Sequence, residues 1–125
     1  MLESREPPER DSRPTKIMRN QEEARWGYMI VWEFRPRQGA EARFEEAYGP
    51  QGVWAKLFAR GEGFVGTELN RDLKDAGRYI TVDLWVSRDA FEAFRAAHQA
   101  EYEAIDQQCE ALTTEEKPLG TFQRL

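Results

Sequence analysis

YITVDLWVSRDAFEAFRAAH, residues 79–98, changes its periodicity in the middle. As far as Val86 it is rich in β-branched and aromatic residues, which is typical of a strand. From Ser87 the apolar residues recur every three or four positions, and Ser87 has the side chain of a helix N-cap. Asp89 then places an acidic group in the first turn. The stretch therefore predicts a strand that leads directly into a capped amphipathic helix.

The apolar spacing of this helix continues beyond residue 98 and predicts one long helix over residues 88–112. Its apolar stripe consists of Phe91, Phe94, His98, Tyr102, Ile105, Cys109 and Leu112. His98 is the only histidine of the chain, and its place on the stripe predicts an imidazole that faces the core. Thr113 and Glu116 have the spacing of a capping box, which indicates a short helical turn after the long helix.

The rest of the chain completes an alternating set of elements. Strands are predicted over residues 28–35, 64–71, 79–86 and 119–125, and shorter helices over residues 40–48 and 51–60. Gly49-Pro50 separates the two shorter helices, because proline removes a helix hydrogen bond. The resulting order predicts an α+β, ferredoxin-like split β-α-β-β-α-β fold, with helices on one face of an antiparallel sheet and the last strand at its edge.

Strand side chains alternate between the two faces of a sheet, so the strands predict what each face carries. The sets expected against the helices are Tyr28, Ile30, Trp32 and Phe34, and Ile80, Val82, Leu84 and Val86, although the pattern leaves this parity open. The opposite sets are mixed but still too apolar for water, so we expect a homodimer whose two sheets face each other and close a barrel. On that open face we expect Glu33, Glu68 and Asp83, paired with Arg35, Arg71 or Arg78.

Length and charge limit the class of protein. The chain has 125 residues, the size of one domain. Residues 1–24 combine prolines and interleaved charges with few large apolar side chains, so we expect a disordered tail before a domain over residues 25–125. Whether Met18 is the true start stays open. The net charge of -5 and the lack of a basic stripe argue against nucleic-acid binding.

Cysteine usage and hydropathy indicate the compartment. The single Cys109 cannot form an internal disulfide, which fits a reducing compartment. No apolar run approaches the length of a membrane span, and the N-terminus lacks the apolar core of a signal peptide. We therefore expect a cytoplasmic protein that does not act at a membrane. One histidine without clustered cysteines argues against a transition-metal site.

The segment Trp85-Val-Ser-Arg-Asp-Ala-Phe91, followed by Ala97-His98, resembles the antibiotic biosynthesis monooxygenase family of dimeric α/β barrels. Residues 29–34 and 63–68 match the layout of that family, so the resemblance covers residues 27–124. The family includes oxygenases that form quinones without flavin or metal, and enzymes that degrade haem. The Asn and Trp that mark the haem branch fall here on Trp32 and Phe94, which argues against a haem cofactor.

The resemblance implies a cofactor-independent monooxygenase that acts on an aromatic or polyphenolic small molecule. His98 would be its general base, because removing a substrate proton yields an electron-rich anion that can itself reduce O₂. The residues implied to shape the substrate pocket are Trp32, Trp85, Phe94, Tyr102, Tyr48 and Trp54.

Other interpretations of the same residues stay open. A more common role for a lone core histidine is that of a buried structural imidazole, hydrogen-bonded to Tyr102 or to a strand group. The aromatic residues are equally ordinary core. The alternative functions are a non-catalytic module that binds a hydrophobic ligand or haem, and a dimeric structural domain whose interior is filled by side chains. The residues alone therefore leave open whether the protein is an enzyme.

Overall fold

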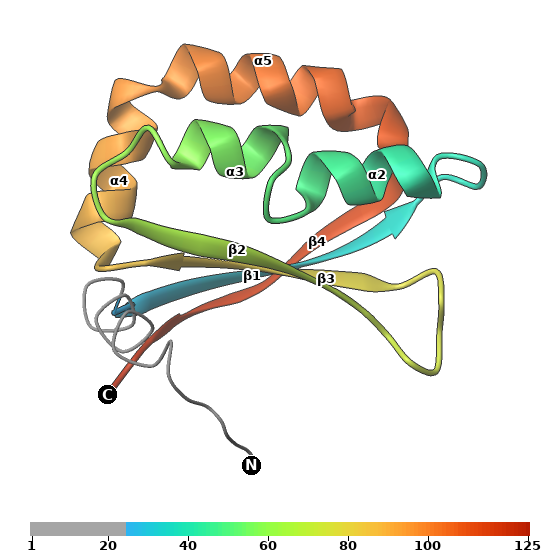
Figure 1. The fold of residues 1–125 in the computed structure, drawn as a ribbon, viewed down its shortest axis with the longest axis horizontal. Helices are drawn as coiled ribbons and strands as arrows, with labels where there is room; N and C mark the ends of the chain where they lie inside the picture. Colours follow the sequence, from blue (N-terminus) through green and yellow to red (C-terminus); the bar gives the residue numbers. More distant parts are fainter. Residues whose placement is uncertain (1–24) are drawn as a thin grey trace, which may run out of the picture.

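The computed structural model describes residues 25–125, and the tail predicted to be disordered, residues 1–24, lies outside them. The strands are β1 (Tyr28–Pro36), β2 (Phe64–Arg71), β3 (Tyr79–Trp85) and β4 (Thr113–Gln123). The helices are α2 (Glu41–Tyr48), α3 (Val53–Phe58), α4 (Arg88–Ala97) and α5 (Gln99–Cys109), the last followed by a 3-10 turn, η1 (Glu110–Leu112). The strands form one antiparallel sheet in the order β2-β3-β1-β4, and the helices lie on one face of it (Figure 1). The predicted α+β, ferredoxin-like arrangement is confirmed.

Two glycines allow neighbouring segments of the chain to pack closely. Gly63, before β2, has a φ of 90°, and a Cβ built there would lie 2.7 Å from Val86 and 2.8 Å from Ala90. Gly52, before α3, would bring a Cβ within 2.2 Å of the carbonyl oxygen of Glu46. Only a residue without a side chain fits either position.

The prediction of one long helix over residues 88–112 is wrong. The α4 helix ends after Ala97, and His98 has φ −124° and ψ 31°, outside helical geometry. Ser87 caps α4 as expected, since its hydroxyl accepts a hydrogen bond from the amide of Ala90. The chain turns at His98 so that α4 stands at the end of the sheet while α5 runs across α3 (Figure 1). The same apolar spacing serves both helices, so periodicity alone does not reveal the turn.

The C-terminal boundaries also differ from the prediction. The residues expected to form a helical turn, 113–116, begin β4, which starts at Thr113 and ends at Gln123. Thr113 and Glu116 do interact, but as neighbours on a strand, with the Thr113 hydroxyl donating to the carboxylate at 3.3 Å. Without β4, one edge of β1 would be unpaired, and the pairing of the two strands over the length of β1 satisfies backbone groups that a single helical turn would leave free.

The predicted parity is correct for β1 and wrong for β3. The register sets Tyr28 opposite Trp85 and Phe34 opposite Tyr79, so these residues share a face. The helix-covered set of β3 is Tyr79, Thr81, Asp83 and Trp85, while Ile80, Val82 and Leu84 lie on the open face. Trp85 has no exposed surface at all, because the aromatic rings of α3, α4 and β2 enclose it. Burying this indole outweighs burying the smaller aliphatic set.

The charges of the sheet follow the corrected parity. Glu33 lies on the open face and pairs with Arg78 at 3.1 Å, as expected. Asp83, predicted beside it, lies on the helix-covered face instead. Arg35 pairs with Asp75 of the β2–β3 loop at 2.6 Å and with Glu115 of β4 at 3.8 Å, and not with any of the three predicted carboxylates. The prediction of a single carboxylate network is therefore correct for Glu33 and wrong for Asp83.

Candidate functional site

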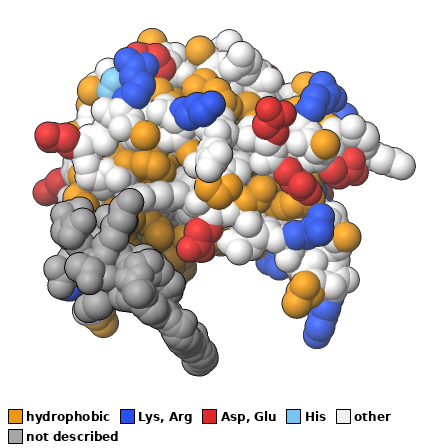
Figure 2. Space-filling view, in the orientation of Figure 1, with side chains coloured by type: hydrophobic (Ala, Val, Ile, Leu, Met, Phe, Trp, Pro, Cys, Tyr) orange, Lys and Arg blue, Asp and Glu red, His pale blue; other side chains and the backbone are white. Residues whose placement is uncertain are grey.

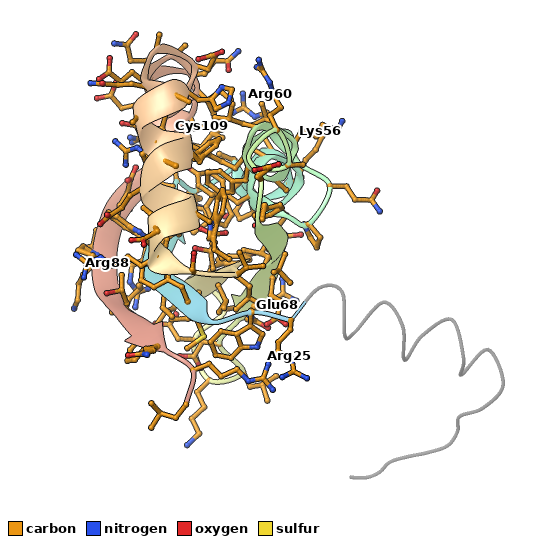
Figure 3. The ribbon with its side chains drawn as sticks, turned by 90° about the vertical axis from the view of Figure 1, so that its left-hand side faces the viewer. Arg25, Lys56, Arg60, Glu68, Arg88 and Cys109 are labelled. Carbon is orange, nitrogen blue, oxygen red and sulfur yellow. The ribbon has the colours of Figure 1, made fainter. Side chains whose placement is uncertain are left out.

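A cavity of about 320 Å³ lies between the helix layer and the sheet. It is lined by Trp32, Phe34, Tyr48, Trp54, Phe58, Thr67, Thr81, Asp83, Arg95, Tyr102, Asp106 and Glu116. Hydrophobic side chains gather in this layer in the space-filling view (Figure 2), and Figure 3 shows side chains between the helices and the sheet. The volume suits a small planar ligand.

The floor of the cavity comes from the helix-covered face of the sheet. Trp32 pairs with Thr81 across β1 and β3, and Thr67 pairs with Asp83 across β2 and β3. Cross-strand partners point to the same face, so the register alone brings these side chains together. The floor thus combines an indole with two hydroxyl groups and one carboxyl group.

Asp83 is the ionisable group of this floor. The hydroxyl of Thr67 donates a hydrogen bond to Oδ1 of Asp83 at 2.7 Å. Burial raises the pKa of the Asp83 carboxyl to about 6, and only the hydrogen bond from Thr67 opposes that rise. A carboxyl group with this pKa changes its protonation near the pH of the cytoplasm, which is what proton transfer requires.

The roof of the cavity is aromatic. The ring of Trp54 lies 4.9 Å from that of Tyr102 in an edge-to-face arrangement, and 6.1 Å from that of Tyr48. Burial raises the pKa of both tyrosines above the ordinary value, so each phenol stays neutral and can donate a hydrogen bond. Flat walls with neutral donors suit an aromatic ligand that carries oxygen atoms.

The side of the cavity under α4 carries a cation. The guanidinium of Arg95 lies 3.8 Å from the centroid of the Tyr102 ring. Its Nε atom is buried and has no hydrogen-bond partner. Asp106 and Glu116 also contribute to the lining, and both residues are exposed, so they lie where the cavity meets solvent. Within residues 25–125, no carboxylate forms an ion pair with Arg95.

The structure brings together part of the set implied by the resemblance. Trp32, Tyr48, Trp54 and Tyr102 line the cavity. Trp85 and Phe94 do not: they are buried beside it, with ring centroids 5.2 Å apart. These two residues support the wall from behind.

His98 lies outside the lining as well. Its ring lies 5.1 Å from that of Phe94, and its Nδ1 lies 3.5 Å from Oε2 of Glu101 without a hydrogen bond. The expected hydrogen bond to Tyr102 or to a strand group is not formed among residues 25–125. The imidazole thus lies at the α4–α5 turn, beside Phe94 and outside the cavity lining.

Sequence reasoning overlooked Thr67 and Arg95 as site residues and placed Asp83 on the wrong face. For Asp83 a signal existed, since it is the only charged residue inside the otherwise uncharged strand YITVDLW. Arg95 gave no comparable signal, because a charged residue beside an apolar stripe is usual on a surface helix. Thr67 becomes notable only through its register with Asp83.

Two negative findings concern residues 25–125 only. No group of three or more His, Cys, Asp and Glu side chains in that part is placed to hold a metal ion. No helix in the same part is long and apolar enough to cross a bilayer.

Comparison with known proteins relates this chain to a family. The family model for antibiotic biosynthesis monooxygenase matches residues 27–105. A variant of SnoaB, a cofactor-independent oxygenase from Streptomyces nogalater, is 30% identical, with 78% of this chain and 91% of that chain covered at a TM-score of 0.59. A putative antibiotic biosynthesis monooxygenase from Bordetella bronchiseptica is 22% identical, with 81% and 99% covered at 0.60.

A further similar structure is a variant of MhuD with two manganese protoporphyrin IX molecules bound per active site. It is 23% identical, with 78% of this chain and 94% of that chain covered at a TM-score of 0.59. The search of curated proteins gives no match. The family match spans most of the described residues: it includes β1 to β3, α2 to α4 and the first part of α5, and it ends before η1 and β4. The chain therefore belongs to the antibiotic biosynthesis monooxygenase family.

Proposed function

We propose that the protein is a cofactor-independent monooxygenase that oxidises an aromatic or polyphenolic small molecule in the cavity between the helices and the sheet. The observation that carries this proposal is an aromatic cavity whose floor holds Asp83, a carboxyl with its pKa raised to about 6. The similarity to SnoaB, a cofactor-independent oxygenase, supports the same class of reaction.

The reaction needs no external reductant. An activated methylene group of the substrate becomes a carbonyl, one atom of O₂ enters that carbonyl and the other leaves as water, so the substrate supplies every electron that O₂ takes up. The protein has to remove a proton to form the electron-rich anion, hold the ring system flat and keep water away. Trp32, Trp54 and Tyr102 supply the flat walls, and Tyr48 supplies a neutral phenol that can donate to a substrate oxygen.

Two residues are candidates for the general base. The family resemblance implies His98, and this remains a prediction. The geometry favours Asp83, because it lines the cavity whereas His98, at the α4–α5 turn, does not. Phe94 and Trp85, also implied by the resemblance, are proposed to position the wall rather than to contact substrate.

Haem binding without catalysis is the alternative, and the residues of the cavity do not fit haem. The only imidazole of the chain lies outside the lining, so no histidine ligand is available there. Burial raises the pKa of the two lining tyrosines, Tyr48 and Tyr102, and so disfavours the phenolate form that would bind iron. Asp106 and Glu116 at the mouth would repel the propionate groups of haem. The MhuD variant binds a metalloporphyrin, so a haemin titration is still informative. A Soret band at stoichiometric haemin would favour this alternative.

We further propose that the protein is a homodimer through the open face of the sheet. Phe122, the β4 partner of Met29, is 47% exposed there, and the register adds an aliphatic row beside it. That row consists of Met29, Val31, Ile80, Val82 and Leu84. A second copy of the same face would cover it. A cytoplasmic location remains a prediction, consistent with Cys109 as a buried free thiol.

Oxygen uptake tests the proposed activity. The purified protein is mixed with a panel of quinols and anthrones in the absence of flavin, haem and added metal, and ¹⁸O₂ is used so that label in the product distinguishes oxygen insertion from an oxidation that only releases H₂O₂. We expect uptake above the autoxidation rate with at least one compound, together with the absorbance of the oxidised product. Uptake at the autoxidation rate with every compound would contradict the proposal.

A further inference from the structure

We propose that the cavity takes a ligand with an acidic hydroxyl group and holds it as an oxyanion, with Asp83 accepting the hydroxyl proton and Arg95 pairing with the oxygen left behind. The inference rests on the proposed function in using the same cavity as the site. It adds the hydroxyl group as the source of the proton that Asp83 accepts, and it assigns Arg95 as the partner of the oxyanion.

Asp83 accepts one hydrogen bond and has no cation beside it among residues 25–125. One carboxylate oxygen, Oδ1, accepts the hydrogen bond from Thr67, and no ion pair to the carboxylate occurs within residues 25–125. The group lies in the cavity lining, so its remaining accessible surface faces the ligand space. A buried carboxylate without a cation is unfavourable, and a proton delivered by a ligand relieves that cost.

Arg95 differs from the paired arginines of the structure. Ion pairs within residues 25–125 hold five other arginines, namely Arg35, Arg60, Arg71, Arg78 and Arg88. Arg95 instead lies over the ring of Tyr102, with a buried Nε that has no hydrogen-bond partner. A guanidinium that lines a cavity with free donors matches the oxygen of a phenolate or enolate.

The two groups do not neutralise each other. Burial raises the pKa of Asp83, and no cation is among the causes that oppose it. Asp83 belongs to the sheet and Arg95 to α4, so a ligand between sheet and helices can reach both. The other titratable groups that face this space are Tyr48 from α2, Tyr102 and Asp106 from α5, and Glu116 from β4.

Those outer carboxylates explain why ionisation takes place inside. Asp106 and Glu116 carry negative charge at the mouth and disfavour entry of a ligand that is already an anion. The neutral hydroxyl compound enters, its O–H bond breaks, the proton moves to Asp83, and the electron pair stays on the ligand oxygen beside Arg95. The total charge of the complex does not change in this step.

The probe for this step is 4-nitrophenol, whose phenol and phenolate forms absorb at different wavelengths. With saturating probe in wild-type protein, we expect the phenolate band at a pH below the solution pKa of the probe. Because the proton is shared within the complex, the phenolate fraction should stay nearly constant across about one pH unit above the pKa of Asp83.

Asp83→Asn separates proton transfer from simple anion binding. The amide keeps an oxygen that can accept the Thr67 hydrogen bond but cannot take the proton. We expect the phenolate-to-phenol ratio of the bound probe to rise about tenfold per pH unit in this variant, as in free solution. A pH profile identical to that of the wild type would overturn the role of Asp83.

Arg95→Met removes the cation and keeps much of the side-chain volume. We expect phenolate affinity to fall by about tenfold or more, with partial recovery in Arg95→Lys, because a point charge replaces the fork of donors. The matched control is Arg88→Met on the same helix, whose side chain is 72% exposed and pairs with Glu92 on the outer side (Figure 3). The control should bind the probe as the wild type does.

The absorbance readout is independent of turnover. Phenolate formation in the wild type without oxygen uptake on any quinol would support the inference and contradict the proposed monooxygenase activity. Oxygen uptake together with a bound probe that stays neutral would do the reverse. A neutral-phenol spectrum, or no saturable binding by the wild type, overturns the inference.

Discussion

The two faces of the sheet differ in the residues that β3 presents on them. The helix-covered face of β3 carries Thr81 and Asp83 between two large aromatic residues, whereas the open face carries an unbroken aliphatic row. On β3, therefore, polar groups lie among the aromatic residues of the interior, and aliphatic groups lie on the open face. An interior polar group that lacks a full set of partners indicates a ligand, and an exterior apolar row indicates a second protein surface.

Asp83→Asn is expected to produce the largest effect, on the interior face. If Asp83 is the base, turnover of a substrate found by oxygen uptake should fall by about 10²- to 10⁴-fold. Thr81→Val, on the same floor but without a proton to exchange at neutral pH, is the matched control. Equal losses of turnover in both variants would mean that Asp83 contributes to the shape of the cavity floor and does not act as the base.

Trp85→Ala compares the packing of the two faces directly. Trp85 has no exposed surface, so its removal leaves a cavity and should lower the free energy of unfolding by about 3–5 kcal/mol. Leu84→Ala, the next residue but on the open face, should cost clearly less in the monomer because its side chain is only half-buried. Chemical denaturation measures both. A larger cost for Leu84→Ala would reverse the assignment of the faces.

Val82→Glu tests the exterior face. Val82 pairs with Val31 at the centre of the aliphatic row, and a buried charge without a partner there should weaken self-association by about 100-fold. Sedimentation velocity at micromolar concentration gives the result. Lys74→Glu, in the exposed β2–β3 loop, changes charge without touching the row and should leave the dimer intact. A wild-type protein that sediments only as a monomer refutes the proposed dimer.

The pH dependence of stability gives a smaller effect on the interior face. Asp83 binds its proton more tightly in the folded state, with a pKa of about 6 against an ordinary value of 3.8. Its contribution to stability is therefore present at low pH and is lost as the pH rises through about 4 to 6, by up to about 3 kcal/mol.

Asp83→Asn should flatten this part of the stability profile and be the more stable protein near neutral pH. Urea denaturation of both proteins between about pH 4 and 7 measures the difference in their free energies of unfolding. Paired surface carboxyls such as Asp72 and Asp75, whose pKa values are lowered, contribute in the opposite direction, and this contribution cancels in the difference because both proteins share it. Parallel profiles would show that Asp83 is not perturbed.

His98→Ala is expected to have the smallest effect. Its ring lies behind the cavity wall against Phe94, so turnover should change by less than about tenfold if Asp83 is the base. Steady-state kinetics beside those of Asp83→Asn decide between the two candidates. A loss in His98→Ala as large as that in Asp83→Asn would restore the imidazole implied by the family resemblance.

Local features of the chain were predictable because their causes are local. The start of α4 follows from the Ser87 cap, and β2 follows from its own β-branched and aromatic residues between turn glycines. Four of the six pocket residues implied by the resemblance do line the cavity. The turn at His98 was missed because both helices keep the same apolar spacing across it.

The amino-acid sequence alone determines the order of strands and helices and the family, because periodicity, caps and turn residues act over a few neighbouring positions. Only tertiary structure determines which face of β3 is covered. That choice depends on whether burying Trp85 and Tyr79 against distant helices is worth more than burying Ile80, Val82 and Leu84. With Trp85 buried, the two-residue period of the strand carries Asp83 into the interior. The candidate site is thus a consequence of long-range packing.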